Sequence, residues 1–382
     1  MDLSWSEAEQ SFRLEARAWL RANVPERPLP SGDTRAGFAA HLEWEHRLHE
    51  ARWSVVSWPE AFGGRDATLW EWLLFEEEYY RAGAPQRVTQ NGVFLLAPTV
   101  FAFGTPEQQR RILPRMAAAQ DLWCQGWSEP GAGSDLASIS SRAIRDEASG
   151  GWRLSGQKTW TTRGAFSTHL FGLFRSDPEA RRHHGLTYFL VPLDAPGVTV
   201  RGFERLDGDE GFAEVFLDNV FVPDADVLGG VNQGWTVAMA TTGSERGLTL
   251  RSPGRFLSAA DRLLDTARQV RTTRPERAAA HRDRAVQAWI DAQAYQLFTL
   301  EQVTAITEGR SIGAESSLNK LFWSELDIRL HETALDLIGA EGEAEGPWSK
   351  GFLFSLAGPI YAGTNEIQRT IVAERLLGLP RK

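Results

Sequence analysis

The chain has 382 residues, a formal net charge of −9 and a hydrophobic content of 42%. This length exceeds one ordinary hydrophobic core, so two or three domains are expected. The acidic balance argues against nucleic acid as a partner, because nucleic-acid binders normally carry a basic surface.

The N-terminus and the cysteine content bear on the cellular compartment. Met1–Trp5 lacks the charged and apolar regions of a signal peptide. The longest apolar stretch, Val93–Phe103, is shorter than the about 20 residues that span a bilayer. Cys124 is the only cysteine, which excludes an internal disulfide and a cysteine-based zinc site. We therefore expect a soluble cytoplasmic protein with no membrane insertion and no metal site.

The first zone of the chain, up to about residue 122, has helical periodicity. Ser6 and Glu9 form a candidate capping box before the first helix. Thr105 followed by Pro106 is a typical helix start. Two further helices are expected, over Phe38–Ala51 and Leu69–Ala82.

From about residue 123 to residue 230 the hydrophobic period changes to two. Glycine, proline and aspartate separate the short alternating segments. Such strands predict a small antiparallel sheet or barrel. The expected strands include Trp152–Leu154, Leu186–Val191, Val198–Phe203 and Glu214–Leu217.

The helical period returns from about residue 233 to the end. Pro253 falls inside the first of these helices and predicts a kink. The order helices–strands–helices lacks βαβ alternation, so a Rossmann fold is not expected. We predict a multidomain α+β protein: a helical N-terminal domain (1–122), a middle β-domain (123–232) and a C-terminal helical domain (233–382). The last domain's helices are expected over Gly234–Val270, Arg282–Glu308, Ser316–Ile338 and Asn365–Leu377.

Three motifs carry residues suited to binding a ligand. The first, WSEPGAGSD at 127–135, has small residues around a proline, which lets the backbone approach a ligand closely. In the second, GQKTWTT at 156–162, Trp160 could lie against a flat ring and Thr162 could hydrogen-bond to it. In the third, YAGTNEIQR at 361–369, Thr364 is a helix N-cap. The alternatives are an ordinary loop, an exposed strand and simple capping.

The three motifs, in this order, resemble the signatures of the acyl-CoA dehydrogenase family, and the resemblance covers essentially the whole chain. The segment Pro59–Gly64 also matches the family pattern. The segments Leu122–Gly126 and Ala373–Pro380 are similar to actinobacterial members, some of which act on steroid-derived thioesters.

The resemblance implies a helical N-domain, a middle β-domain and a C-terminal four-helix bundle, with FAD between the middle domain and the bundle. The activity implied is oxidation of the Cα–Cβ bond of an acyl-CoA to a trans-2-enoyl thioester. Implied partners are an electron-transfer flavoprotein and a homotetramer or heterotetramer with a related subunit. By motif match, the cofactor-binding residues are Gln125, Trp127, Ser128, Ser134, Trp160, Thr161, Thr162, Thr364 and Glu366.

The catalytic base departs from the commoner family pattern. Many members carry a glutamate between the Tyr and Gly of the third motif, where this chain has Ala362. A second family solution places the base on the long helix directly before an arginine, and Glu245-Arg246 stands at that place. The resemblance therefore implies Glu245 as the base, with Ser134, Arg246 and Ala362 at the substrate. Without that context, a Glu-Arg pair is ordinarily a solvated helix face.

The adenine end of the FAD site departs as well. The family's Arg-x-x-Phe-Gly stands here as Arg274–Ala278 without Phe-Gly, and its Gln-x-x-Gly-Gly stands as Asp336–Ala340. A different subunit is an alternative source of these contacts. Two alternatives to a complete dehydrogenase therefore remain: a non-catalytic subunit of a heteromeric enzyme, and a flavin oxidase or monooxygenase on the same fold.

Overall fold

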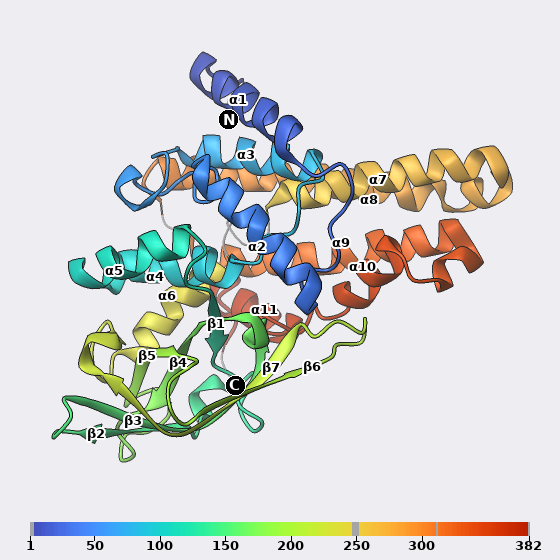
Figure 1. Cartoon of the computed structure of the whole chain (residues 1–382). Coiled ribbons are helices and arrows are strands. Elements are labelled where there is room, and N and C mark those ends of the chain that lie inside the picture. The colour runs from blue at the N-terminus through green and yellow to red at the C-terminus, as the bar shows by residue number, and fades with distance from the viewer. Residues whose placement is uncertain (1–3, 247–251, 311, 381–382) are drawn as a thin grey trace. The chain divides into compact units, whose positions relative to one another are not determined.

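The computed structural model describes residues 4–246, 252–310 and 312–380, without the side chains of residues 244–246 (Figure 1). Contacts between residues divide the chain into two units. The first unit comprises Met1–Glu26, Ala67–Ala84 and Arg246–Lys382. The second comprises Arg27–Asp66 and Pro85–Glu245. The predicted boundaries near residues 122 and 232 do not coincide with this division and stay a prediction.

The first unit consists of helices. Its helix α1 begins after Ser6, whose hydroxyl accepts the Glu9 N–H while the Glu9 carboxylate accepts the Ser6 N–H. The predicted capping box is therefore confirmed. A 3₁₀ turn covers Gly339–Glu343 and a π-helical turn covers Val372–Leu376. The helices are α1 (Glu7–Asn23), α3 (Leu69–Arg81), α7 (Pro253–Thr273), α8 (Pro275–Thr307), α9 (Glu315–Ile338), α10 (Pro347–Ser355) and α11 (Asn365–Ile371).

Helices α7, α8 and α9 share one apolar core, and Figure 1 shows α7 and α8 running alongside each other. Three buried rings meet in this core: the centroid of Phe256 lies 5.4 Å from that of Tyr295 and 6.4 Å from that of Trp323. Helix α7 approaches α3 closely at Gly254. A Cβ there would stand 2.9 Å from the carbonyl oxygen of Glu76, so the contact requires glycine.

The second unit places four helices with a sheet. Thr105 caps α5 through the N–H of Gln108, with Pro106 at the first helical position, as predicted. A π-helical turn covers Asn91–Leu96. Short 3₁₀ turns cover Glu60–Phe62, Leu136–Ser138, Gly164–Phe166 and Asp224–Asp226. The helices are α2 (Arg35–Glu50), α4 (Ala97–Phe103), α5 (Pro106–Ala117) and α6 (Gly234–Arg246).

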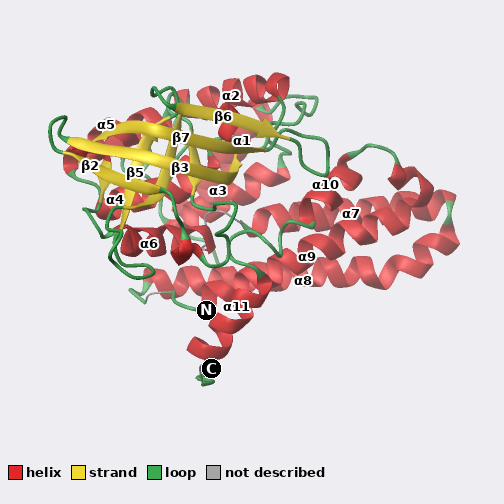
Figure 2. Ribbon diagram, turned by 90° about the horizontal axis from the view of Figure 1, so that it is seen from below, coloured by secondary structure: helices red, strands yellow, loops and turns green. Residues whose placement is uncertain are grey.

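The sheet has eight strands in the order β6-β7-β3-β2-β4-β5-β8, and β1 also pairs with β4. Figure 2 shows β6, β7 and β3 lying next to one another in this sheet. Its interior is formed by buried aliphatic and aromatic residues such as Leu154, Leu170 and Phe189. The strands are β1 (Trp123–Gly126), β2 (Arg142–Asp146), β3 (Gly151–Thr162), β4 (His169–Arg175), β5 (Leu186–Pro192), β6 (Val198–Phe203), β7 (Phe212–Pro223) and β8 (Val227–Leu228).

The predicted β-domain is confirmed, with one difference: the sheet is mixed. Strand β1 pairs with β4 in parallel, and β2 meets β4 in parallel at one residue pair, Arg142 and Arg175. The other pairings are antiparallel. Strand β1 follows helix α5 and reaches β4 only after the β2–β3 hairpin, so no tight turn forces an antiparallel pairing.

Two predicted helices need correction. The helix expected over Gly234–Val270 is not continuous, because Ser252 is the non-helical N-cap from which α7 begins at Pro253; α6 is described as far as Arg246. Pro253 does not mark a kink. It occupies the first position of α7, where the backbone N–H that proline lacks would have no partner within the helix. The helix expected over Asn365–Leu377 is regular only to Ile371 and continues as the π-helical turn.

Candidate functional site

The first two motifs are joined within the second unit. The backbone N–H of Thr159 on β3 donates to the carbonyl of Ser128 at 2.9 Å. The Lys158 ammonium lies 2.8 Å from the Glu129 carboxylate. A backbone hydrogen bond and a neighbouring ion pair therefore join strand β3 to the loop of the first motif.

The Glu129–Lys158 ion pair is enclosed. Lys158 is 0% exposed and Glu129 is 6% exposed. The remaining capacity of the carboxylate is used by the N–H groups of Ser140 and Ser141, at 2.6 and 3.0 Å. The ammonium also donates to the carbonyl of Leu173 at 2.7 Å. A buried pair whose further hydrogen bonds are supplied in this way is the arrangement in which the low dielectric strengthens the attraction.

Both members of this pair are ionised at neutral pH. Burial alone would raise the pKa of Glu129, but the Lys158 ammonium and the hydrogen bonds from Ser140 and Ser141 lower that pKa to about 2. Burial lowers the pKa of Lys158 to about 8, against the attraction of Glu129. The pair therefore acts as a fixed structural bond of the motif loop and not as a proton donor or acceptor.

The glycines of the two motifs have different roles. A Cβ on Gly131 or Gly133 would meet no atom within 4 Å, so both face open space on the loop. Gly156 has a φ of +150°, and a Cβ there would stand 2.1 Å from the Ser141 hydroxyl. Gly156 is therefore required for β3 to pass the segment that binds Glu129.

Strand β3 is interrupted by a bulge at Trp160. The register with β7 shifts between Lys158 and Thr161, and Trp160 takes a left-handed φ of 57°. Its indole is 61% exposed and meets Phe203 and Phe212 edge-on, with centroids 5.3 and 5.6 Å apart. The bulge turns a large aromatic face outward from a strand whose next residue, Thr161, is fully buried.

Three predicted cofactor residues of this unit carry buried polar atoms without a hydrogen-bond partner among the described residues: Gln125 Nε2, Trp127 Nε1 and Thr161 Oγ1. Leaving such atoms unpaired costs free energy, so a bound group that supplies partners is favoured. Amide, indole and hydroxyl groups suit the polar edge of a ring system, and an exposed indole such as that of Trp160 suits its flat face. The residues present therefore fit a flavin. Ser128 and Thr162 are partly buried beside them, whereas Ser134 is exposed.

A second ion network fixes the residue that follows Thr162. The guanidinium of Arg163, which is buried, lies 2.6 Å from Asp33, whose other oxygen lies 2.6 Å from Arg205. Burial would raise the pKa of Asp33, but the two arginines hold it below its usual value. Asn91 donates to the carbonyl of Thr162 at 3.3 Å. Buried ion pairs of Lys158 and Arg163 therefore fix β3 before and after the predicted flavin residues 160–162.

The third motif belongs to the first unit. The Thr364 hydroxyl accepts the N–H of Ile367 at 3.3 Å, which confirms the predicted N-cap of α11. Glu366 is exposed, and hydrogen bonds from its own backbone N–H and from Thr364 lower the pKa of its carboxyl. Ala362 is partly buried and has a left-handed φ of 58°.

The predicted base and its neighbour fall at the edge of the described chain. The backbone of Glu245 and Arg246 belongs to helix α6. Their side chains lie outside the described residues. The assignment of Glu245 as the base and of Arg246 as a substrate residue stays a prediction.

Sequence reasoning named all three motifs but missed the Glu129–Lys158 pair and the role of Gln368, whose side chain donates to the Ala362 carbonyl at 2.7 Å. A signal was present in each case. The glutamate of the first motif and the lysine of the second carry opposite charges, which makes them candidates for a pair. A glutamine one turn into a capped helix can reach back to the preceding turn.

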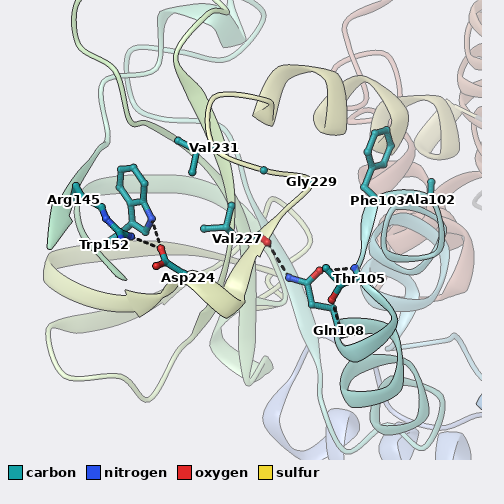
Figure 3. Close-up of a pocket in the computed structure, with 11 residues that line it drawn as sticks. Ala102, Phe103, Thr105, Gln108, Arg145, Trp152, Asp224, Val227, Gly229 and Val231 are labelled. Carbon is teal, nitrogen blue, oxygen red and sulfur yellow. Dashed lines mark hydrogen bonds and ion pairs between the residues drawn. The ribbon is translucent and has the colours of Figure 1, made fainter. Parts of the chain in front are cut away.

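A separate cleft of about 780 Å³ lies in the second unit, at the start of α5 (Figure 3). None of the predicted site residues lines it. Two of its polar side chains are paired with other groups of the protein: Trp152 donates to Asp224 at 3.0 Å, and Gln108 donates to the Val227 carbonyl at 2.9 Å (Figure 3). The cleft therefore does not take the place of the predicted site, whose residues lie elsewhere.

Two further properties concern the described residues only. No group of three or more His, Cys, Asp or Glu side chains in that part of the chain is placed to hold a metal ion. Among its helices, none is both long enough and apolar enough to cross a membrane.

Comparison with known proteins gives one family for all parts of the chain. Residues 6–120 match the acyl-CoA dehydrogenase N-terminal domain, residues 124–220 its middle domain and residues 232–377 its C-terminal domain. The acyl-CoA dehydrogenase IpdE1 of Mycobacterium tuberculosis is 40% identical over 387 residues, covering 98% of each chain. IpdE1 of Mycolicibacterium smegmatis is 38% identical over 400 residues, again covering 98% of each.

Solved structures agree with these relatives. A steroid acyl-CoA dehydrogenase, Tcur3481-Tcur3483, matches with a TM-score of 0.87 and 27% identity over 100% of both chains. The ChsE4-ChsE5 complex of Mycobacterium tuberculosis matches with a TM-score of 0.86 and 26% identity over 100% of both chains. The fold, the motifs and these similarities lead to one conclusion: this chain is an oxidoreductase that belongs to the acyl-CoA dehydrogenase family.

Proposed function

We propose that this chain is the catalytic subunit of an FAD-dependent enzyme that oxidises the Cα–Cβ bond of an acyl-CoA to a trans-2-enoyl-CoA. The observation that carries the proposal is the pair of motifs fastened by Glu129 and Lys158, with unpartnered polar atoms on Gln125, Trp127 and Thr161. Two motifs joined by a buried ion pair, with polar groups beside them left unpaired, support a resident flavin.

The proposed cofactor residues divide between the two units, and each set is assigned by motif match. FAD, when bound, supplies the acceptor for the hydride that leaves the substrate β-carbon. Trp160 would lie against the ring system, and Ser134 would also contact the thioester end of the substrate. The residues that would hold FAD are Gln125, Trp127, Ser128, Ser134, Trp160, Thr161, Thr162, Thr364 and Glu366.

We propose that Glu245 removes the α-proton, because alanine at 362 cannot accept one. The α-proton of a thioester is weakly acidic, so the carbonyl oxygen must be hydrogen-bonded as negative charge develops on it. The backbone N–H of Ala362 is suited to this, since no acceptor within the described residues takes it. A carboxylate base works best when its surroundings are poor in water, because burial disfavours its charged form. Arg246 would shape the site beside the base.

The proposed substrate is a thioester derived from a steroid. The name of one structural relative, a steroid acyl-CoA dehydrogenase, supports this choice over a simple fatty acyl chain. The proposed acceptor of the electrons is an electron-transfer flavoprotein, as the family resemblance implies.

The proposed assembly is a tetramer, with two pairs of related but different chains as the favoured form. An exposed apolar stripe on α8 supports assembly through the bundle, because Val286, Ile290 and Leu297 are 43, 46 and 47% exposed at helical spacing. The missing Phe-Gly after Arg274 supports a different subunit as the source of the adenine contacts. Light scattering of the purified protein should give about four times the chain mass. A stable monomer of 42.6 kDa that binds FAD and turns over would exclude the assembly.

The reaction is tested with a panel of CoA thioesters, from short acyl chains to steroid-derived acids, added to the purified yellow protein without oxygen. We expect at least one steroid-derived thioester to bleach the flavin, and denaturation to release FAD at up to one per active site. A protein that carries no flavin, even when produced together with a related subunit, would contradict the proposal. Fully occupied FMN would contradict it too.

A further inference from the structure

The turn before α11 has an unusual backbone. Ala362 and Gly363 both adopt the left-handed conformation, with φ of 58° and 79°. Glycine adopts it without strain, but for alanine it costs about 1–2 kcal/mol. A non-glycine residue keeps such a conformation only where its surroundings fix it, and such positions gather at functional sites.

Gln368 supplies the fixing contact. Its side-chain amide Nε2 donates to the carbonyl of Ala362 at 2.7 Å and to that of Gly363 at 3.3 Å. The Gln368 side chain is fully buried, and its Oε1 has no partner in the described part of the chain. A buried amide that spends one donor group on two carbonyls of the turn determines where that turn lies.

The start of α11 is held from the other side by a buried lysine. Lys320 of α9 is 0% exposed, and its ammonium donates to the Asn365 side-chain oxygen at 2.7 Å. The Ser324 hydroxyl donates to the same oxygen at 3.2 Å. The Asn365 N–H in turn donates to the Pro359 carbonyl at 2.8 Å. The turn therefore has little freedom at either end.

We propose that Gln368 is a positioning residue for the reaction: it holds the Ala362 carbonyl so that the Ala362 N–H is presented to the thioester oxygen. This inference rests on the proposed function. The N–H is free to act, because no described residue accepts it, while the carbonyl of the same residue is pinned. The N–H and the carbonyl of Ala362 lie in adjacent peptide planes, so Gln368 acts on the N–H indirectly, by fixing the backbone angles of the turn. The thioester would thus be polarised by a backbone group that a side chain outside the reaction holds in place.

The first experiment measures the turn itself, without any substrate. In the FAD-loaded protein, hydrogen–deuterium exchange is followed over peptides covering residues 357–367, which include the hydrogen-bonded N–H groups of Tyr361 and Asn365. Gln368→Met keeps the length of the side chain but donates no hydrogen bond, so exchange in these peptides should be about tenfold faster or more. Gln368→Glu, of similar size, is the second variant in case the first does not fold.

Gln302→Met is the matched control. Gln302 lies on α8, is 4% exposed and accepts a hydrogen bond from Asn319 at 2.6 Å, so its loss removes an equally buried amide elsewhere in the unit. Both variants lose a buried hydrogen bond, so the melting temperature of each should fall. Only Gln368→Met should change the exchange over residues 357–367. Exchange that is equal in wild type and Gln368→Met would overturn the inference.

The second experiment links the turn to catalysis. With the thioester that bleaches the wild-type flavin fastest, Gln368→Met should lower kcat about 10- to 100-fold with little change in KM, and Gln302→Met should change neither. Faster exchange with an unchanged kcat would overturn the catalytic role. If the wild type oxidises no thioester, the proposed function fails, and the exchange result alone decides whether Gln368 holds the turn.

Discussion

Replacing Glu245 with glutamine is expected to lower kcat by about 10²–10⁴-fold while FAD remains bound, because the variant keeps size and hydrogen bonding but loses basicity. The measurement is flavin bleaching in a stopped-flow instrument, with FAD content determined on the same sample. Glu107→Gln, on the exposed first turn of α5, is the matched control and should bleach at the wild-type rate.

A second variant tests the location of the base. Adding Ala362→Glu to Glu245→Gln moves the carboxylate to the position used by many family members, so part of the lost rate should return. The family resemblance assigns both positions to one thioester. Near-normal turnover in Glu245→Gln alone would exclude Glu245 as the base, since a structural glutamate on a solvated helix face changes little when neutralised.

Lys158→Met is expected to lower the free energy of unfolding by about 3–5 kcal/mol, because it leaves the Glu129 carboxylate charged, buried and without its counter-ion. The same change should lower the FAD content, since Glu129 belongs to the first motif and Lys158 precedes the bulge at Trp160. Urea unfolding, together with the flavin absorbance of the purified variant, measures both effects.

Arg153→Met is the matched control for Lys158→Met. Arg153 lies on the same strand and lies 2.9 Å from Asp146, but its side chain is 37% exposed, so the loss should not exceed about 1 kcal/mol. The double variant Glu129→Gln with Lys158→Met removes both charges and should recover part of the stability. A Lys158→Met protein as stable as Arg153→Met would refute the structural role of the buried pair.

Local features were predictable from the sequence. The helix starts at Ser6, Thr105 and Thr364 depend on a hydroxyl and an N–H three residues apart, a spacing that the sequence displays directly. The change from helical to strand periodicity located the sheet, because this period can also be read directly from neighbouring residues. The ligand-binding roles of the motif residues stay predictions.

Features that depend on distant pairing were not predictable. Glu129 and Lys158 are 29 positions apart, and only the folded sheet decides which buried carboxylate meets which lysine. The parallel pairing of β1 with β4 arises from the path of the intervening hairpin, not from either strand's composition. Pro253 has the same covalent effect at a kink and at a helix start, so the sequence alone did not distinguish a bent helix from two helices.

The most direct test of the central claim is the product of the anaerobic reaction with the thioester that bleaches the flavin. Mass spectrometry should find a thioester that has lost two hydrogens, and deuterium placed at the α- and β-carbons should show that one came from each. The amount of product should equal the amount of flavin bleached. A product of unchanged mass, a product that has gained oxygen, or a reaction that proceeds only with O₂ would contradict the assignment as an acyl-CoA dehydrogenase acting through α,β-dehydrogenation.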